Sequence, residues 1–444
     1  MMRVAVLLLA LTPSTPLASA KPPTSRDVGR LVNEATTIEE ALATAKLLPF
    51  AGEETQHWET QDIHIARRRK SLTALLRRVM RWTVGGAATE ARGRALAHDD
   101  FARCVQLLAE PGPPDAYAVE RRDGLRLVAA LAQTSDALAP VARDVAAAFR
   151  VALEELDGAP GATTGLNWAA RRCASAGVPV TALDALDAAE RACGLPFRIH
   201  VDAVAVPEVD ELAAALPLKA ETIATRTGAL VLERRRTAWL AEPGIGALAY
   251  SGKLMAPEPM PDAVRTISEK LSGESGLLDA PTFDCTLCNL YPAGEDAACK
   301  FHSDPEHGSH WHLSTAVVSC GEPRRFAFRR IGAEDDDRDR HVFHLFHGDV
   351  VEMFDQCQDV YQHGVLAPED ATNQGARVSL VLKNALLLPS GKKGHGLPGS
   401  GATRSDKRKA KIKKVATAGD RRELRDERPK PKPGRRRRRA ATAR

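Results

Sequence analysis

Three side chains in this sequence have the types and the spacing of a metal site. His302 and Asp304 are separated by one residue. On an extended strand such residues face the same side, so both can reach one ion. His363, further along the chain, offers a third ligand. Two histidines and one carboxylate form the facial triad that holds Fe(II) and leaves positions open, so the sequence predicts an iron site.

A strand-like stretch downstream of the histidine carries cations on one face. With a period of two, Arg377, Ser379 and Lys383 share one side. The other side is apolar and consists of Val378, Leu380 and Leu382. An inward-facing row of cations needs an anion, and a dicarboxylate co-substrate would supply one.

These residues form an ordered set that resembles the AlkB family of Fe(II)/2-oxoglutarate dioxygenases. The family pattern is Asn-x-Tyr-x-x-Gly, then His-x-Asp, a distant His, and Arg-x-Asn/Ser followed by a cation. The matching positions are Asn289, Tyr291, Gly294, His302, Asp304, His363, Arg377, Ser379 and Lys383. Upstream, the segments around Arg236, Trp239 and Tyr250 look like the family's nucleotide-recognition segment. The resemblance covers roughly residues 195–390.

The resemblance implies Fe(II) as the metal, with 2-oxoglutarate and O₂ as co-substrates. Arg377 would pair with the distal carboxylate of 2-oxoglutarate, in a charge-assisted contact. Asn289, Tyr291 and Ser379 would line the same pocket. Lys383 stands where the family often has a second arginine. The implied reaction is oxidative demethylation of N-methylated bases in DNA or RNA, a nucleic-acid dealkylation repair that releases formaldehyde, succinate and CO₂.

A base inside a duplex must leave the stack to reach such a site. Glu306 matches the family's acidic residue that contacts the flipped base, although it could also be an ordinary solvated glutamate. Arg236 belongs to the same predicted substrate-binding set. Trp239 and Tyr250 could stack on the base or pack in the core.

Other residues compete for the metal. His341, His344 and His347 are alternatives to His363, and we expect them to be exposed strand or loop residues. His307, His310 and His312 could form an adventitious metal site or a solvated loop. A zinc site is suggested by the ligand spacing of Cys285, Cys288, Cys299 and His302. A strand over 283–291 disfavours zinc, because it points Cys285 and Cys288 to opposite faces.

Two kinds of secondary structure divide the chain. Residues 25–194 show helical periodicity, with apolar stripes at Leu72, Leu75, Leu76 and Val79 and at Leu138, Val141, Val145, Phe149, Leu153 and Leu156. We expect the second of these helices to stop at residues 158–161 and a shorter one to end at Gly194. After Leu195 short strands of period two predominate, which predicts an α+β protein with a double-stranded β-helix (jelly-roll) catalytic domain.

Composition and charge predict features of the two ends of the chain and of its compartment. The tail from Lys392 carries 21 Lys/Arg against 5 Asp/Glu, while the whole chain has a net charge of +5, so the rest is acidic. Such a tail is expected to be disordered and to favour a polyanionic partner. Residues 1–24 read as a possible targeting leader, and no run is long enough for stable membrane insertion. The eight cysteines suit a reducing compartment.

The predicted domains are therefore 1–24, a leader; 25–194, an α-helical region; 195–390, the dioxygenase; and 391–444, the basic tail. We expect a monomer that acts on nucleic acid in the nucleus, or in a plastid or mitochondrion if the leader is real. Two alternatives remain open at this point. One is an oxygenase acting on protein or lipid, and the other is an RNA-binding helical protein with a vestigial oxygenase domain.

Overall fold

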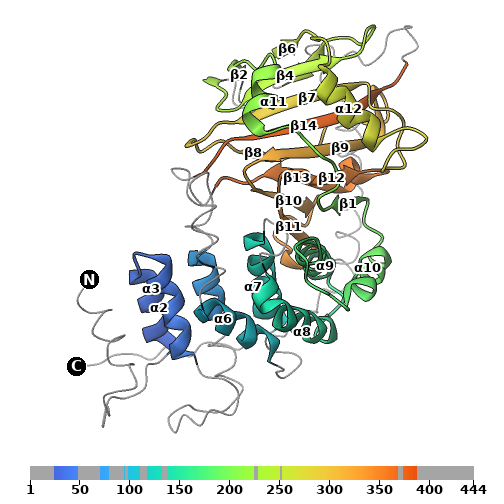
Figure 1. Ribbon diagram of the computed structural model, residues 1–444. Coiled ribbons are helices and arrows are strands. Elements are labelled where there is room, and N and C mark those ends of the chain that lie inside the picture. The colour runs from blue at the N-terminus through green and yellow to red at the C-terminus, as the bar shows by residue number, and fades with distance from the viewer. Residues whose placement is uncertain are drawn as a thin grey trace, which may run out of the picture. The chain divides into compact units, whose positions relative to one another are not determined.

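The computed structural model describes residues 25–48, 71–79, 95, 99–110, 118–132, 138–224, 229–250, 253–368 and 374–387 (Figure 1). The predicted leader and the predicted disordered tail both lie outside these residues. The N-terminal part of the described chain is helical and the C-terminal part consists mainly of antiparallel strands. The expectation of a mixed fold that begins with helices is thereby confirmed.

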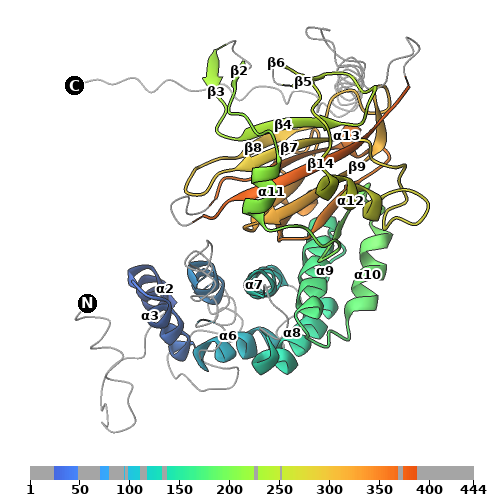
Figure 2. The same ribbon diagram turned by 45° about the horizontal axis from the view of Figure 1, so that its top comes forward.

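The helical part follows the apolar stripes of the sequence. The first predicted stripe is buried, and so is the second as far as Phe149, since none of these side chains is more than 2% exposed. Leu153 and Leu156, at the end of the second stripe, are partly buried. Figure 2 shows the helices following one another along the chain. They are α2 (Ser25–Glu34), α3 (Ile38–Ala43), η1 (Thr44–Leu47), a helix over 71–79, α6 (Asp99–Ala109), α7 (Ala118–Leu131), η2 (Ala139–Val141), α8 (Ala142–Glu154), α9 (Pro160–Ser175) and α10 (Leu183–Ala192).

Helix α9 was not predicted from the sequence. Helix α8 ends at Glu154, a few residues before the predicted stop at 158–161, and Gly158 in the following link has a positive φ of 72°. However, Pro160 is also the first residue of the next helix, a position where its missing N–H costs nothing. Most residues of α9 are buried, so the helix has no polar face and therefore no amphipathic stripe to recognise.

Two antiparallel sheets form the second half of the chain. The first has the order β1-β12-β9-β14-β7-β4. Its strands are β1 (Phe197–His200), β4 (Arg236–Ala241), β7 (Cys285–Tyr291), β9 (Trp311–Gly321), β12 (Val350–Met353) and β14 (Arg377–Ala385). The second has the order β11-β10-β13-β8. Its strands are β8 (Cys299–His302), β10 (Arg324–Arg330), β11 (Arg340–Leu345) and β13 (Tyr361–Val365).

Smaller elements complete this half. Two short hairpins pair β2 (Thr222–Ala224) with β3 (Leu230–Leu232) and β5 (Leu248–Tyr250) with β6 (Lys253–Met255). Helices α11 (Val209–Ala215) and α12 (Asp262–Leu271) share one apolar cluster with the six-stranded sheet, including Val378, Leu380 and Leu382 of β14. The remaining elements are η3 (Asp337–Asp339) and α13 (Cys357–Val360). Helices thus cover one face of the larger sheet, which leaves its other face for the site.

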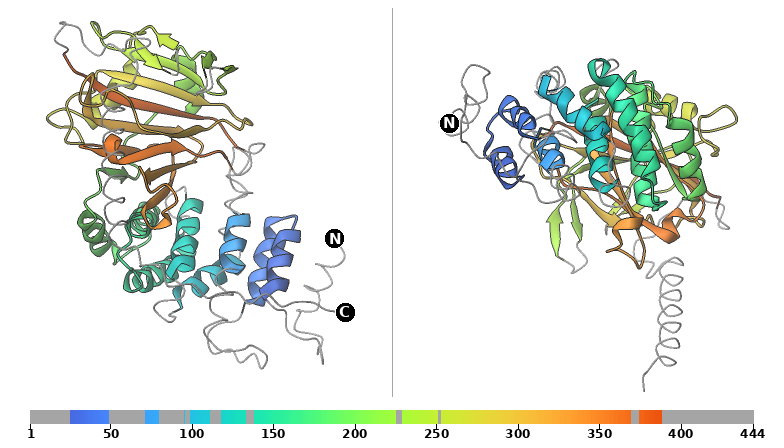
Figure 3. Two further views of the ribbon diagram at one scale, coloured as in Figure 1. Left: turned by 180° about the vertical axis from the view of Figure 1, so that it is seen from behind. Right: turned by 90° about the horizontal axis from the view of Figure 1, so that it is seen from below.

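Helix α9 packs directly against β11 of the smaller sheet. A Cβ atom at Gly161 would collide with the carbonyl oxygen of Arg340, so only glycine allows this approach. Deeper in the contact, Thr164 Oγ1 lies 2.8 Å from His341 Nδ1. One apolar cluster contains side chains of the helices and of the strands, among them Leu166, Trp168, Phe343 and Leu345. Figure 3 shows the blue-to-green helices gathered on one side of the strands.

The predicted jelly-roll connectivity and the predicted domain boundaries stay predictions. Within the described residues, no helix combines the length and the apolar character that a membrane span requires.

Candidate active site

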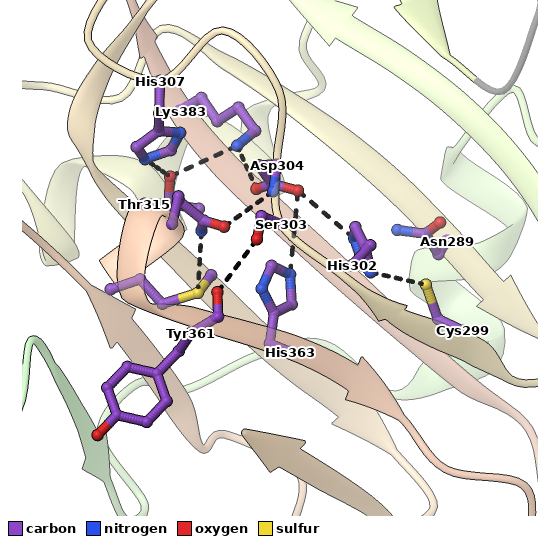
Figure 4. Close-up of polar contacts among 12 residues, drawn as sticks. Asn289, Cys299, His302, Ser303, Asp304, His307, Thr315, Tyr361, His363 and Lys383 are labelled. Carbon is purple, nitrogen blue, oxygen red and sulfur yellow. Dashed lines mark hydrogen bonds and ion pairs between the residues drawn. The ribbon is translucent and has the colours of Figure 1, made fainter. Parts of the chain in front are cut away.

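The pairing of β8 with β13 assembles the predicted metal triad. His302 and His363 are direct partners in this antiparallel pair, and Asp304 follows the end of β8. One donor atom from each of the three residues lies within 4.8 Å of the other two, the arrangement one ion needs (Figure 4). Asp304 Oδ1 lies 3.5 Å from His302 Nε2 and 3.9 Å from His363 Nε2. Among the described residues, no other group of this kind occurs.

Different contacts orient the two imidazoles. His302 Nδ1 lies 2.9 Å from the carbonyl oxygen of Lys300, so Nδ1 donates and Nε2 is the metal-binding nitrogen. Burial alone would lower the pKa of His302, but Cys299 and Asp304 raise it well above its usual range, so Nε2 must lose a proton when a metal binds. His363 instead stacks on Phe326, with ring centroids 5.7 Å apart and an interplanar angle of 9°. Burial, followed by the charge of His302, lowers the pKa of His363 to about 3. His363 is therefore neutral, as a metal ligand must be.

Lys383 fixes the carboxylate of the triad. Its Nζ lies 2.6 Å from Asp304 Oδ2, which leaves Oδ1 facing the two histidines. The backbone N–H of Asp304 donates to Gln358 Oε1 at 2.8 Å. Burial alone would raise the pKa of Asp304, but Lys383 and the two histidines hold it well below its usual range. The carboxylate is thus ionised and oriented without a metal.

The triad opens into a cavity between the two sheets. The predicted co-substrate residues Asn289, Tyr291, Ser379 and Lys383 all line it, together with His302, Asp304 and His363. The period-two prediction for β14 is confirmed, because its alternate residues Ser379 and Lys383 face this cavity. Most of the remaining wall is apolar and includes Leu248, Leu287, Trp311, Val317, Phe326 and Val381.

Arg377 lies behind Tyr291 and is fully buried. Its Nε donates to Ser319 Oγ at 2.9 Å. Within the described residues, its Nη1 and Nη2 have no hydrogen-bond partner. Its Cζ lies 5.3 Å from the centroid of the Tyr291 ring. A buried guanidinium with two unpartnered donor groups fits the distal carboxylate of a dicarboxylate ligand.

Comparison with known proteins gives a family consistent with this geometry. The sequence model of the 2OG-Fe(II) oxygenase superfamily matches residues 224–383. "Uncharacterized protein R406" from Acanthamoeba polyphaga mimivirus is 30% identical over 189 residues, which are 42% of this chain and 93% of that protein. This chain belongs to the 2OG-Fe(II) oxygenase superfamily. The recognition of an AlkB-like 2OG-Fe(II) oxygenase from the sequence is confirmed at the level of this superfamily.

A solved structure titled "The structure of OsALKBH1" is also similar. It is 16% identical, with a TM-score of 0.29, and the match covers 43% of this oxygenase and 97% of that chain.

The predicted substrate residues of the oxygenase do not gather on the cavity wall. Trp239 is 1% exposed, donates from Nε1 to the carbonyl oxygen of Gly246, and packs edge-on against Trp311. Arg236 is exposed at the start of β4 and is not part of the cavity wall. Glu306 has a positive φ of 62°, and its carboxylate lies 3.8 Å from His310. The side chain of Tyr250 lies outside the described residues. Base contact by any of these four stays a prediction.

Arg235 lines the cavity, although it was not among the predicted site residues. Its Nη1 donates to Asn289 Oδ1 at 3.2 Å, and its Nη2 pairs with Glu233 at 2.6 Å. Trp239 pairs with Leu287, a cavity residue, so alternation places Arg235 and not Arg236 on the side of the cavity.

The rival metal ligands are placed elsewhere. His341 was expected to be exposed, and this was wrong, because the packing of α9 on β11 buries it. His344, for which exposure was also expected, is half-buried. His341 contacts Asp339 at 3.0 Å, and His344 lies against Trp168. The predicted opposite orientation of the zinc candidates is confirmed, since Cys285 and Cys288 belong to different apolar clusters.

Proposed function

We propose that this oxygenase demethylates N-methylated bases in DNA or RNA. It would consume 2-oxoglutarate and O₂ and release formaldehyde, succinate and CO₂. The observation that carries the proposal is the convergence of His302, Asp304 and His363 in the cavity that Asn289 and Tyr291 also line. The two antiparallel sheets that enclose this cavity are proposed to form a double-stranded β-helix.

The donor set fits Fe(II). Two imidazole nitrogens and one carboxylate oxygen form the facial triad that holds Fe(II). His302 presents Nε2 because Nδ1 is held by Lys300, and Asp304 presents Oδ1 because Oδ2 is held by Lys383. Bound Fe(II) would supply the activation of O₂ that couples decarboxylation of the 2-oxo acid to oxidation of a substrate C–H bond.

The chain's own residues would hold the co-substrate at the opposite end of the cavity. Arg377, anchored by Ser319, offers two unpartnered N–H groups to the distal carboxylate. Asn289 and Ser379, direct partners on β7 and β14, add polar groups to the wall. A dicarboxylate would therefore lie along the inner face of β7 and β14, between Arg377 and the triad.

The wall around the triad suits a flat, mostly apolar group. Leu248, Leu287 and Trp311 line this cavity, and Arg235 and Lys383 are cations on its wall. A methylated base extruded from the stack presents such a surface, with ring edges that can accept or donate hydrogen bonds. The resemblance of the sequence to AlkB enzymes and the basic tail both support nucleic acid as the substrate.

A screen of methylated oligonucleotides tests the proposal. Full-length protein with Fe(II) and 2-oxoglutarate is incubated with single-stranded and duplex DNA and RNA that carry different N-methylated bases. Formaldehyde and the restored base are then measured. His363→Ala serves as the inactive control. Succinate formation without formaldehyde from any oligonucleotide, together with oxidation of peptides or lipids, would reject nucleic acid as the substrate and keep the oxygenase assignment.

A further inference from the structure

Tyr291 lies among three arginines. Its ring lines the cavity. The Cζ atoms of Arg377, Arg324 and Arg235 lie 5.3, 5.7 and 5.9 Å from the ring centroid, respectively. Arg377 opens β14, and Arg324 opens β10 in the opposite sheet. Arg235 is neutralised by its ion pair with Glu233, so it differs from the other two.

Arg324 is buried without an anion. Arg324 is 2% exposed. Within the described residues, its Nη1 donates to the carbonyl oxygen of Ala297 at 3.3 Å. Its Nε and Nη2 have no hydrogen-bond partner within the described part of the chain, and neither do Nη1 and Nη2 of Arg377. Four donor nitrogens of two guanidiniums are therefore unsatisfied around one phenol ring.

Such an arrangement is unfavourable unless an anion joins it. A buried charge without a partner costs free energy, and so does each buried donor without an acceptor. Burial, followed by the charge of Arg377, lowers the pKa of Arg324 to about 10, so Arg324 stays charged at neutral pH. The Tyr291 ring does not compensate, because 5.7 Å lies near the outer limit of a cation–π contact.

We propose that Arg324 is a second arginine for the distal carboxylate of the 2-oxo acid co-substrate. The carboxylate would lie beside the Tyr291 ring and accept from Arg377 on one sheet and Arg324 on the other. The inference rests on the proposed use of 2-oxoglutarate. It adds a residue that selects the dicarboxylate over 2-oxo acids without a second charge.

Binding to the full-length protein tests this contact. Mn(II) replaces Fe(II), O₂ is excluded, and calorimetry gives the dissociation constants of 2-oxoglutarate and 2-oxopentanoate. The second ligand has the same chain length and the same 2-oxo acid end but lacks the distal carboxylate. We expect Arg324→Met to weaken 2-oxoglutarate about tenfold, which equals about 1.4 kcal/mol, and to leave 2-oxopentanoate unchanged. Arg325→Met, a substitution of the neighbouring arginine outside the Tyr291 cluster, should change neither constant.

Two results would overturn the proposal. An unchanged affinity for 2-oxoglutarate would show that Arg324 does not contact it. Equal losses for both ligands would assign Arg324 to the support of Tyr291 alone. Arg324→Gln provides the same comparison if the methionine variant does not fold. Failure of the wild type to bind 2-oxoglutarate at all is a separate result, because it rejects the proposed co-substrate itself.

Thermal unfolding adds a readout that separates binding from structure. Without co-substrate, Arg324→Met should unfold at a temperature no lower than the wild type, because the substitution removes an uncompensated buried charge. The rise in unfolding temperature on addition of 2-oxoglutarate should be smaller in the variant. A variant that is less stable without ligand and shows the wild-type rise would contradict the proposal.

Discussion

In the described part of the chain, charge is compensated at the metal triad but not at the two arginines beside Tyr291, which we call the metal end and the arginine end. At the metal end, Asp304 is compensated by Lys383 at 2.6 Å, and both groups keep fixed positions without an ion. At the arginine end, Arg377 and Arg324 have no ion-pair partner within the described residues. The metal end is therefore already organised, whereas the arginine end gains most of its stabilisation when an anion binds. Binding of an anion at the arginine end should consequently stabilise the protein more than rearrangement at the metal end does.

The largest expected effect comes from removal of a triad ligand. Asp304→Ala, like His302→Ala, should abolish 2-oxoglutarate turnover, because each substitution removes a donor from the metal. Succinate formation and metal content measure the loss. His310→Ala, which changes a nearby histidine outside the triad, is the matched control and should keep both. Wild-type succinate production by either triad variant would contradict the assignment.

The arginine end is tested by Arg377→Met. This variant should raise the apparent KM for 2-oxoglutarate. The rise should correspond to a loss of about 1.5–3 kcal/mol in binding free energy, the value of a charge-assisted hydrogen bond. Metal content should stay unchanged, since Arg377 touches no triad residue in the hydrogen-bond pattern of the structure. An unchanged KM in a folded variant would place the carboxylate site elsewhere.

The metal end is tested by Lys383→Met. Without Nζ, the Asp304 carboxylate loses the contact that turns Oδ1 toward the histidines. Loss of such an orienting partner typically weakens metal binding by about tenfold or more. Mn(II) titration measures the effect. An effect on 2-oxoglutarate binding alone would instead mean that Lys383 serves the co-substrate, as the sequence predicted.

Arg235 and Arg236 form a matched pair on neighbouring positions. Arg235→Met should slow demethylation of an oligonucleotide by a factor that corresponds to roughly 1 kcal/mol in activation free energy. It should spare the decarboxylation of 2-oxoglutarate in the absence of an oligonucleotide. Arg236→Met should change neither rate, because this side chain lies outside the cavity wall. A parallel loss of both activities in Arg235→Met would indicate that it mainly supports Asn289.

The smallest expected effect on catalysis is that of the tail. Deletion of residues 392–444 should weaken nucleic-acid binding most at low salt, since each phosphate neutralised adds about −0.9 to the slope of log K against log salt on duplex DNA. The kcat on a short saturating oligonucleotide should change little. Equal salt slopes for full-length and truncated protein would leave no binding role for the tail.

The sequence predicted the strands that carry the site because their chemistry repeats with a period of two. On β14 the alternation of Ser379 and Lys383 with Leu380 and Leu382 sets both the cavity face and the core face. His302 and His363 could be matched by type, but only the strand pairing shows that they are opposite each other.

What could not be predicted depends on contacts between distant segments. The burial of His341 and the partial burial of His344 come from α9, which lies far away in the sequence and has no amphipathic pattern. Arg324 is a second example. Its unsatisfied donors emerge from the meeting of β10 with Tyr291 of the other sheet.

The close approach of Gly161 to β11 has a practical consequence for fragments of this chain. The region that matches the superfamily, residues 224–383, includes neither α9 nor β1. A fragment cut to these limits would expose the apolar side chains that pack on α9, and it would leave β12 as an open sheet edge. Open edges and bare apolar faces promote aggregation. Recombinant production of the catalytic half should therefore retain α9 and β1.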